Sequence, residues 1–316
     1  MQMQVIFHYP AGPDLAQRLG DLTEFGIEVT IVLPEDQTQF TEVLQSSAVL
    51  WHVLEPVTER HIRQAPNLRL IQKVGIGVDT IDIDAAKQAG IAVCNLPGTN
   101  SRAVAELAVA LMLGVLRKIP VFDRETRRGD GWKWPTNRQG SLGEIGGKTV
   151  GLVGYGAVPR QLAPILLGFG AKIVYCDIQS FPDAVGTRLG LEELLAISDI
   201  VSLHLPLTET TQHIIDRSSI ALMKKSGILI NTARGGLVDQ DALAEALQTS
   251  RLAAAGLDTF PTEPVEINNP LLKLDNVVAS PHIAWLTMET FDRSIEILAE
   301  NCRRLNAGED LLHRVA

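Results

Sequence analysis

The chain has 316 residues, of which 46% are hydrophobic and 21% charged, and its formal net charge is −9 at pH 7. This composition suits a globular protein with an ample core and, at this length, two domains rather than one. The acidic balance disfavours a nucleic-acid partner, and the lack of an 18-residue apolar run or a signal-peptide pattern gives no reason to expect a membrane partner.

Strands and helices alternate in the first 99 residues. We predict strands over residues 3–9, 27–32, 48–53, 68–75 and 91–96, with a helix after each of the first four. These strands are continuous apolar runs, which are typical of parallel strands that are covered on both faces. The alternation therefore predicts a doubly wound α/β fold.

A second series of the same kind begins at Thr149. Before it lie a helix predicted over about 101–117 and a polar stretch with glycine and tryptophan, residues 127–147, which is the clearest loop or boundary in the chain. After it, a final helix runs from about 288 to 305. We predict two doubly wound lobes, one formed by residues 1–99 and 286–316 and the other by residues 100–285.

A candidate cofactor site lies in the stretch GLVGYGAVPR, residues 151–160, which follows an apolar strand and opens a helix. Gly154 and Gly156 fit the dinucleotide fingerprint, in which a tight turn and a bare backbone let a pyrophosphate approach a helix N-terminus. The amides of Ala157 and Val158 are the expected phosphate donors. Pro159 replaces the third fingerprint glycine, and proline is tolerated in a first helical turn.

Asp177 ends the next predicted strand, where a carboxylate accepts the ribose hydroxyls of NAD. A 2′-phosphate about 4 Å away would be opposed by about 4 kcal/mol per unit charge at an effective dielectric constant near 20. No arginine or lysine occupies residues 178–180, so the sequence favours NAD over NADP. A plain strand–helix turn with a surface aspartate is the alternative interpretation.

Seven stretches resemble the D-isomer-specific 2-hydroxyacid dehydrogenases, and together they span nearly the whole chain. They are KVGIGVDTIDIDAAKQAGI, NLPGTNSRAVAELAVALML, GLVGYG with the later aspartate, DIVSLHLPLTETT, LINTARGGLVDQDALAEAL, AAGLDTFPTEP and NVVASPHIAW. The chain is most similar to the phosphoglycerate, glycerate and hydroxypyruvate dehydrogenase branches. The resemblance implies a Rossmann NAD-binding domain inserted into a flavodoxin-like substrate domain, and a homodimer.

The resemblance also implies three catalytic residues: Arg234 of NTARGG, Glu263 of PTEP and His282 of SPHI. Oxidation of a 2-hydroxy acid needs a base for the hydroxyl proton, and histidine suits this task. A carboxylate behind the imidazole fixes its tautomer, and a guanidinium binds carboxylate and carbonyl oxygens together. We expect Gly235 and Gly236 to leave room for substrate and nicotinamide. A strand-end salt bridge, a turn residue and a core histidine are the structural alternatives for the three.

Two further groups of residues are expected to bind ligands. For NAD they are His204, Pro206, Thr232, Ala233 and Asp258, with Asp258 bonded to the nicotinamide amide. For the substrate they are Lys73, Val74, Gly75, Ile76, Gly77, Asn100 and Trp285, with the backbone amides of residues 75–77 forming an anion site. Trp285 is more typical of glycerate or hydroxypyruvate reductases than of phosphoglycerate relatives.

Cysteine usage and surface character bear on location and partners. Cys94, Cys176 and Cys302 are scattered and odd in number, which favours a reducing cytoplasm, and no metal-ligand spacing occurs. The apolar helix and the loop with Trp132 and Trp134 favour a homodimer. A small 2-hydroxy or 2-keto acid is the expected partner. The alternative is a non-enzymatic NAD-sensing corepressor or scaffold of the same fold, against which the complete catalytic set argues.

Overall fold

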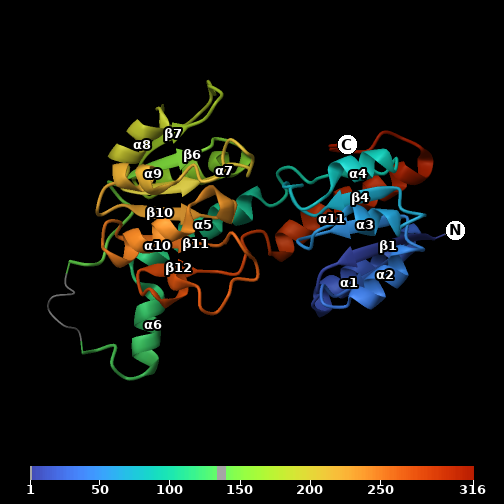
Figure 1. Ribbon diagram of the computed structural model, residues 1–316, viewed down its shortest axis with the longest axis horizontal. Helices are drawn as coiled ribbons and strands as arrows, with labels where there is room; N and C mark the ends of the chain where they lie inside the picture. Colours follow the sequence, from blue (N-terminus) through green and yellow to red (C-terminus); the bar gives the residue numbers. More distant parts are fainter. Residues whose placement is uncertain (1, 134–139) are drawn as a thin grey trace. The chain divides into compact units, whose positions relative to one another are not determined.

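The chain forms two compact units, one of Met1–Asn100 with Leu286–Ala316 and the other of Ser101–Trp285. The computed structural model describes residues 2–133 and 140–316. Each unit has one sheet of parallel strands, labelled in Figure 1. Because the chain leaves the first unit after Asn100 and returns to it at Leu286, the second unit is an insertion in the first.

The first unit has a five-stranded sheet in the order β2-β1-β3-β4-β5. Its strands are β1 (Met3–His8), β2 (Ile27–Val32), β3 (Val49–His52), β4 (Leu70–Lys73) and β5 (Ala92–Cys94). Its helices are α1 (Pro13–Asp21), α2 (Gln37–Leu44), α3 (Glu59–Arg63), α4 (Ile83–Gln88) and α11 (Met288–Ala307), with a 3-10 turn, η1, at Leu22–Phe25. All its strand pairs are parallel, as in a flavodoxin-like sheet.

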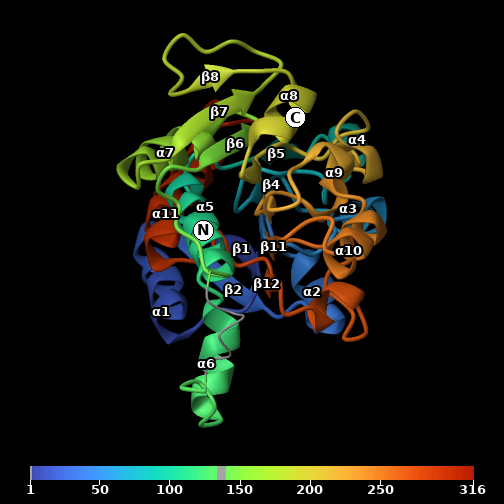
Figure 2. The same cartoon turned by 90° about the vertical axis from the view of Figure 1, so that its left-hand side faces the viewer.

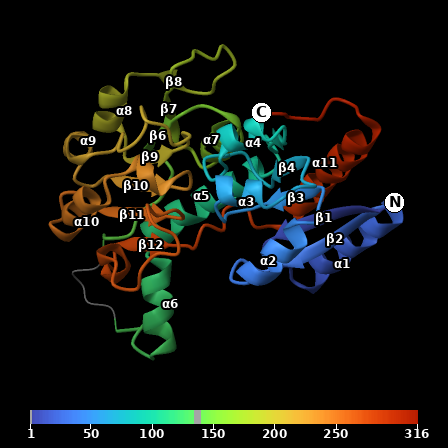
Figure 3. The same ribbon diagram turned by 45° about the vertical axis from the view of Figure 1, so that its right-hand side comes forward.

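Helices cover both faces of this sheet (Figure 3). On one face, α2, α3 and α4 bury their apolar side chains in a single core cluster with strand residues such as Ile6 and Ile71. On the other face, α11 packs its Phe291 ring against Phe7, with the ring centroids 6.3 Å apart. The C-terminal helix therefore completes the fold of the N-terminal residues.

The second unit has a seven-stranded sheet in the order β12-β11-β10-β9-β6-β7-β8. Its strands are β6 (Thr149–Val153), β7 (Lys172–Cys176), β8 (Thr187–Arg188), β9 (Ile200–Leu203), β10 (Ile228–Asn231), β11 (Ala254–Leu257) and β12 (Val277–Ala279). Its helices are α5 (Ser101–Leu116), α6 (Ile119–Arg127), α7 (Ala157–Gly168), α8 (Leu191–Ile197), α9 (Arg217–Leu222) and α10 (Gln240–Gln248), with 3-10 turns η3 (Gly235–Leu237) and η4 (Pro270–Lys273).

The order of strands reverses beside β6, which lies between β7 and β9. This is the switch point at which doubly wound sheets bind dinucleotides. One core cluster joins α5 and α7 to the sheet, and another joins α8, α9 and α10. The predicted fold class, two doubly wound parallel sheets with one domain inserted in the other, is confirmed.

Two elements of the second unit differ from the sequence prediction. Residues 119–127 form α6, which begins after Lys118 in a left-handed conformation, with Pro120 in its first turn. Figure 2 shows α6 extending away from the rest of its unit. The stretch 127–147, predicted as a loop or boundary, lies inside the second unit, and its residues 134–139 are outside the described ranges. The second difference is β8, a two-residue edge strand beside β7.

Candidate active site and cofactor site

Three neighbouring parallel strands of the second unit end level with one another. β10 pairs with β11 so that Asn231 lies opposite Leu257, and β11 pairs with β12 so that Leu257 lies opposite Ala279. The loops after these strands carry the residues predicted to be catalytic: Arg234, Glu263 and His282. Since ligands bind at the carboxyl ends of strands in α/β sheets, this register places the three loops at a functional edge.

The turn that carries Arg234 is held by the buried side chain of Asn231. Its Oδ1 accepts a hydrogen bond from the amide of Ala233 at 3.0 Å, and its Nδ2 donates to the carbonyl of Arg234 at 2.9 Å. Arg234 is half-buried and extended, and its Nη1 donates to the Ala233 carbonyl at 2.8 Å. Asn231 was not among the predicted site residues, although a side-chain amide at the end of a buried strand is a recognisable signal.

Gly235 and Gly236 are needed for packing within the protein. A Cβ on Gly235 would lie 1.9 Å from the carbonyl carbon of Phe260, and one on Gly236 would lie 2.8 Å from Cδ2 of Leu207. The prediction that these glycines leave room for substrate and nicotinamide is therefore wrong, because the protein itself occupies that space. Gly235 lets the Arg234 turn approach the backbone of the loop that carries Glu263.

His282 and Glu263 form a close pair, with 2.6 Å between Nδ1 and Oε2. The other carboxylate oxygen, Oε1, accepts the amide of Phe260 at 2.8 Å. Burial acts to raise the pKa of Glu263, but the hydrogen bond and charge of His282, the Phe260 amide and the charge of Arg234 together lower it below its usual value. The carboxylate is therefore ionised at neutral pH and orients the imidazole.

Asp258 holds the turn on which His282 stands. This residue is 0% exposed, and its carboxylate accepts hydrogen bonds from Ser280 Oγ at 2.5 Å and from the amides of Ile283 and Ala284 at 3.0 and 2.9 Å. Its carbonyl accepts the His282 amide at 2.8 Å. Asp258 thus serves the protein's own loop, and its predicted contact with nicotinamide stays a prediction.

His282 has a left-handed backbone, with φ of 56°. Such a conformation costs a non-glycine residue free energy, and neighbouring contacts must compensate for it. Trp285 supplies one of them, because its Nε1 donates to the His282 carbonyl at 3.1 Å. The indole is buried, so Trp285, which was predicted to bind substrate, supports the turn that carries His282 in this structure.

The predicted cofactor site lies where β6 meets α7. Gly154 has φ of 91°, and a Cβ there would lie 2.7 Å from the carbonyl oxygen of His204, so only glycine fits this turn. Gly156 precedes α7, and no atom of the described residues, its chain neighbours aside, lies within 4 Å of the place where its Cβ would be. As the N-cap of α7, Gly156 has no side chain to cap the helix, so within residues 2–133 and 140–316 the amides of Ala157 and Val158 remain for a ligand.

Asp177 lies beside this turn. Its Oδ2 accepts the amide of Tyr155 at 2.7 Å and its Oδ1 accepts the amide of Gln179 at 2.9 Å. These bonds fix the carboxylate at the carboxyl edge of β6 and β7, as the sequence predicted for a ribose-binding acid. Arg188, which was not predicted as a site residue, donates from its guanidinium to the carbonyls of Asp177 and Ile178. The available sequence signal was an arginine two residues after Gly186, but its strand, β8, is too short to be recognised from the sequence.

The remaining predicted cofactor residues differ in their surroundings. Thr232 Oγ1 and His204 Nε2 are buried with no partner among residues 2–133 and 140–316, so each could bond a ligand. Burial lowers the pKa of His204 to about 3, so its ring is neutral. Pro206 is exposed and Ala233 is half-buried. Open space at Gly156, unused amides, a fixed carboxylate and two unpartnered polar atoms fit a dinucleotide.

The residues predicted to bind substrate lie in the first unit, except Trp285. The carbonyls of Gly75 and Ile76 accept hydrogen bonds from the Leu96 amide and from Asn95 Nδ2, at 2.8 and 3.0 Å. Across the described ranges, the amides of residues 75–77 donate no hydrogen bond, which leaves them for an anion.

The other predicted substrate residues of the first unit are placed as follows. The Lys73 side chain is buried and its Nζ donates to the Val53 carbonyl, so the ammonium serves the fold, and its contact with substrate stays a prediction. Val74 is buried, and its amide donates to the His52 carbonyl at 2.8 Å. Asn100 is half-buried at the end of the unit.

Known proteins resemble this chain in sequence and fold. It is 43% identical over 253 residues to the hydroxypyruvate reductase of Thermotoga maritima, covering 79% of this chain and 81% of that protein. It is 38% identical over 281 residues to the glyoxylate reductase of Korarchaeum cryptofilum, covering 87% and 84%. A crystal structure of a Thermus thermophilus protein superposes with a TM-score of 0.90 at 33% identity, over 99% of this chain and 100% of that one.

Residues 109–284 match the family model for the D-isomer specific 2-hydroxyacid dehydrogenase, NAD binding domain. This range holds the fingerprint turn at Gly154, the carboxylate of Asp177 and the His282–Glu263 pair. The family that the sequence motifs indicated is therefore confirmed, and NAD is its cofactor. The chain belongs to the D-isomer-specific 2-hydroxyacid dehydrogenases and is an NAD-dependent oxidoreductase of that family.

Proposed function

We propose that this chain reduces a small 2-keto acid with NADH, and oxidises the matching D-2-hydroxy acid, with His282 as acid and base. The observation that carries this proposal is the 2.6 Å contact between His282 Nδ1 and Glu263 Oε2. Because Nδ1 is bonded to the carboxylate, Nε2 is the nitrogen that exchanges a proton with the substrate oxygen. Glu263 stabilises the imidazolium that exists before reduction and after oxidation.

Arg234 is the residue that we propose binds the oxygen atoms of the substrate. A planar guanidinium binds a carboxylate oxygen and the neighbouring carbonyl oxygen together, and its charge polarises the carbonyl in the reduction direction. When bound, NADH supplies the hydride that reaches C2. The protein then holds the keto acid, gives a proton from His282 Nε2 to the carbonyl oxygen and offsets the charge that develops on it.

The cofactor contacts belong to the same proposal. The amides of Ala157 and Val158 would hold the pyrophosphate, Asp177 the ribose hydroxyls, and Thr232 Oγ1 a polar group of the nicotinamide half. The unused amides of residues 75–77 would receive the substrate carboxylate.

The substrate class follows from the relatives. Glyoxylate and hydroxypyruvate are the first candidates, because relatives over most of this chain carry those names. A 3-phosphoglycerate type is the second, since a D-3-phosphoglycerate dehydrogenase is 41% identical over 80% of this chain, which spans 48% of that protein's length.

The test is a steady-state comparison of glyoxylate, hydroxypyruvate and 3-phosphohydroxypyruvate with NADH. We expect a higher kcat/KM for one of the first two than for the phosphorylated acid. A higher value for the phosphorylated acid would contradict the substrate proposal but not the catalytic one. NADH binding without turnover of any 2-keto acid would instead support the corepressor or scaffold alternative.

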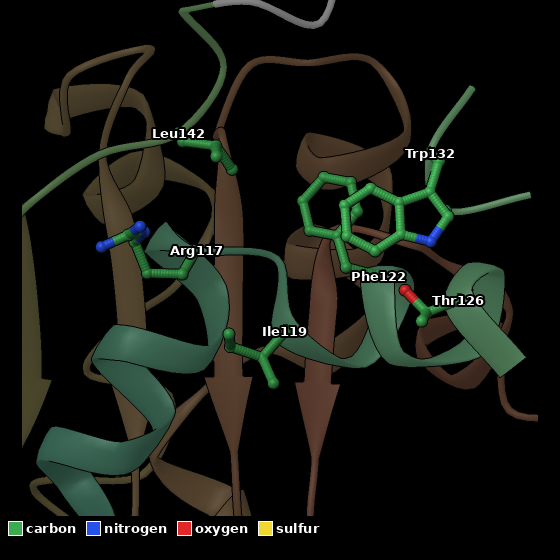
Figure 4. Close-up of a pocket in the computed structure, with 7 residues that line it drawn as sticks. Arg117, Ile119, Phe122, Thr126, Trp132 and Leu142 are labelled. Atoms are coloured by element: carbon green, nitrogen blue, oxygen red, sulfur yellow. The ribbon is translucent and has the colours of Figure 1, made fainter. Parts of the chain in front are cut away.

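We also propose a homodimer that uses the surface around α6. Trp132 is 91% exposed and Ile119 is 56% exposed, and both line a hollow with Phe122 that Figure 4 shows. Apolar side chains of this size on one surface are typical of an interface. Trp134, the other tryptophan of this loop, lies outside the described residues. Sedimentation of a monomer at micromolar concentration would contradict the dimer.

A cytoplasmic location is the last part of the proposal. Cys94, Cys176 and Cys302 are free thiols, as suits a reducing compartment. Burial raises the pKa of Cys94 to about 11 and that of Cys302 to about 12, so these two thiols stay protonated at neutral pH. In residues 2–133 and 140–316, no helix combines the length and apolar character that crossing a membrane requires. Fractionation of the native cells would test the location.

A further inference from the structure

Arg188 stands at the edge of the proposed ribose site. It ends β8, which pairs in parallel with β7 so that Arg188 lies opposite Tyr175. Its Nη2 donates to the Asp177 carbonyl at 2.9 Å and to the Ile178 carbonyl at 3.3 Å, and its Nε donates to the Asp177 carbonyl at 3.3 Å. The guanidinium therefore lies against the backbone of the residue whose carboxylate is proposed to bind the ribose.

Arg188 keeps its positive charge available at this edge. Among the described residues it has no carboxylate within ion-pair distance, and the acceptors of its hydrogen bonds are backbone carbonyls. The other arginine near this loop, Arg160, is paired with Asp183, and its guanidinium lies 4.8 Å from the centroid of the Phe181 ring. Arg188 is exposed, so an anion from solvent can reach it.

The side chains of Asp177 and Arg188 have opposite effects on a 2′-phosphate. The carboxylate of Asp177 repels it, whereas a guanidinium is the side chain best shaped to bind it. The two residues are neighbours in the fold, because Nη2 of Arg188 donates to the carbonyl of Asp177 itself. Residues 178–180 contain no cation, but the fold supplies one from β8.

We propose that Arg188 is a second determinant of cofactor choice: it binds the 2′-phosphate of an NADP-type dinucleotide, and Asp177 masks this ability. The inference rests on the proposed placement of the ribose at Asp177. NAD remains the preferred cofactor while the carboxylate is present. Removing the carboxylate leaves an arginine already in place, so one substitution at Asp177 gives affinity for a 2′-phosphate.

Two nucleotides that differ only by the 2′-phosphate isolate the contribution of Arg188 to binding that phosphate. Isothermal titration with 5′-AMP and with adenosine 2′,5′-bisphosphate measures the contribution of the 2′-phosphate to binding. We expect Asp177→Ser to bind the bisphosphate roughly 10- to 100-fold more tightly than the unchanged protein, the scale of one charge-assisted hydrogen-bonded contact. Adding Arg188→Met should remove at least about tenfold of that gain while 5′-AMP binding changes by less than about twofold.

Further variants separate charge, shape and folding. Arg188→Lys in the Asp177→Ser background keeps the charge but loses the planar fork, so we expect bisphosphate binding between that of the arginine and methionine forms. Arg217→Met is the matched control, because Arg217 is an exposed arginine of the same unit, paired with Glu245 far along the chain from this loop. It removes the same net charge and should leave both titrations unchanged.

The outcomes are distinct. If Arg188→Met weakens 5′-AMP and the bisphosphate equally, Arg188 is only a support for the loop and the proposal fails. It fails too if the gain from Asp177→Ser is the same with and without Arg188. If the unchanged protein binds neither 5′-AMP nor NADH, the proposed cofactor site itself is wrong. The ratio of kcat/KM for NADPH and NADH across the same variants should follow the titrations.

Discussion

Replacing Gly235 with alanine tests how the loops that carry the proposed catalytic residues are held together. The backbone of Gly235 packs against Phe260 so closely that an added Cβ would lie 1.9 Å from the Phe260 carbonyl carbon, 2.3 Å from its oxygen and 2.3 Å from the nitrogen of Pro261. Ordinary contact begins at 3.4 Å. The two loops must therefore separate by about 1.5 Å, and all three atoms belong to backbone, which cannot rotate aside.

The displaced segment is the one that positions Glu263. The Phe260 amide donates to Oε1 of Glu263 at 2.8 Å, and Oε2 of the same carboxylate contacts His282 at 2.6 Å. A misplacement of about 1 Å in such a set costs about 10²-fold in rate. We expect Gly235→Ala to lower kcat about 10²-fold and the free energy of unfolding by about 1–3 kcal/mol, the usual cost of overpacking.

The adjacent glycine provides a matched control. A Cβ on Gly236 would meet Cδ2 of Leu207 at 2.8 Å, which is the far end of a flexible side chain. Gly236→Ala should therefore cost much less in both properties. The assays are steady-state reduction of hydroxypyruvate or glyoxylate with NADH, and urea unfolding. Equal damage from the two substitutions, or normal turnover in Gly235→Ala, would refute the reasoning.

Three other changes have defined outcomes. His282→Ala should lower kcat by about 10²- to 10⁴-fold and leave NADH binding unchanged by fluorescence titration, and near-native turnover would contradict its role. Glu263→Gln removes the charge that stabilises the imidazolium, so the pH optimum for reduction should move to lower pH in the profile of kcat/KM against pH. An unchanged profile would contradict the proposed role of Glu263 beside His282. Burial, assisted by the charge of His61, lowers the pKa of His8 to about 4. Because the unfolded chain protonates His8 at a higher pH than the folded protein does, the free energy of unfolding should fall by about 3 kcal/mol as the pH decreases from 6.5 to 4. In urea unfolding, His8→Phe should reduce this dependence of the free energy of unfolding on pH.

The sequence predicted what depends on long apolar runs and local glycine patterns. The strands other than β8, the fingerprint turn at Gly154 and the carboxylate of Asp177 follow from short-range signals. The elements it missed lack such signals. β8 is two residues long, and no element was predicted for residues 119–126, where α6 follows a left-handed Lys118 and has Pro120 in its first turn.

Long-range packing explains the remaining errors. The purpose of Gly235 depends on Phe260, which lies 25 positions away in the chain and becomes a neighbour only because β10 and β11 pair. Arg188 reaches Asp177 for a similar reason, since β8 pairs with β7. A sequence pattern identifies which residue types are available, but the contacts that assign their roles arise when the sheet forms.

The sheet does not hold the three loops that carry the proposed catalytic residues equally firmly. Arg234 follows β10, an interior strand with partners on both sides, whereas His282 follows β12, a three-residue strand at the edge. A short edge strand resists fraying poorly. Three hydrogen bonds to the carboxylate of Asp258 and one to its carbonyl compensate for this, because they join the His282 turn to the end of β11. The position of His282, the proposed catalytic histidine, therefore depends more on one buried aspartate than on the hydrogen bonds of its own strand.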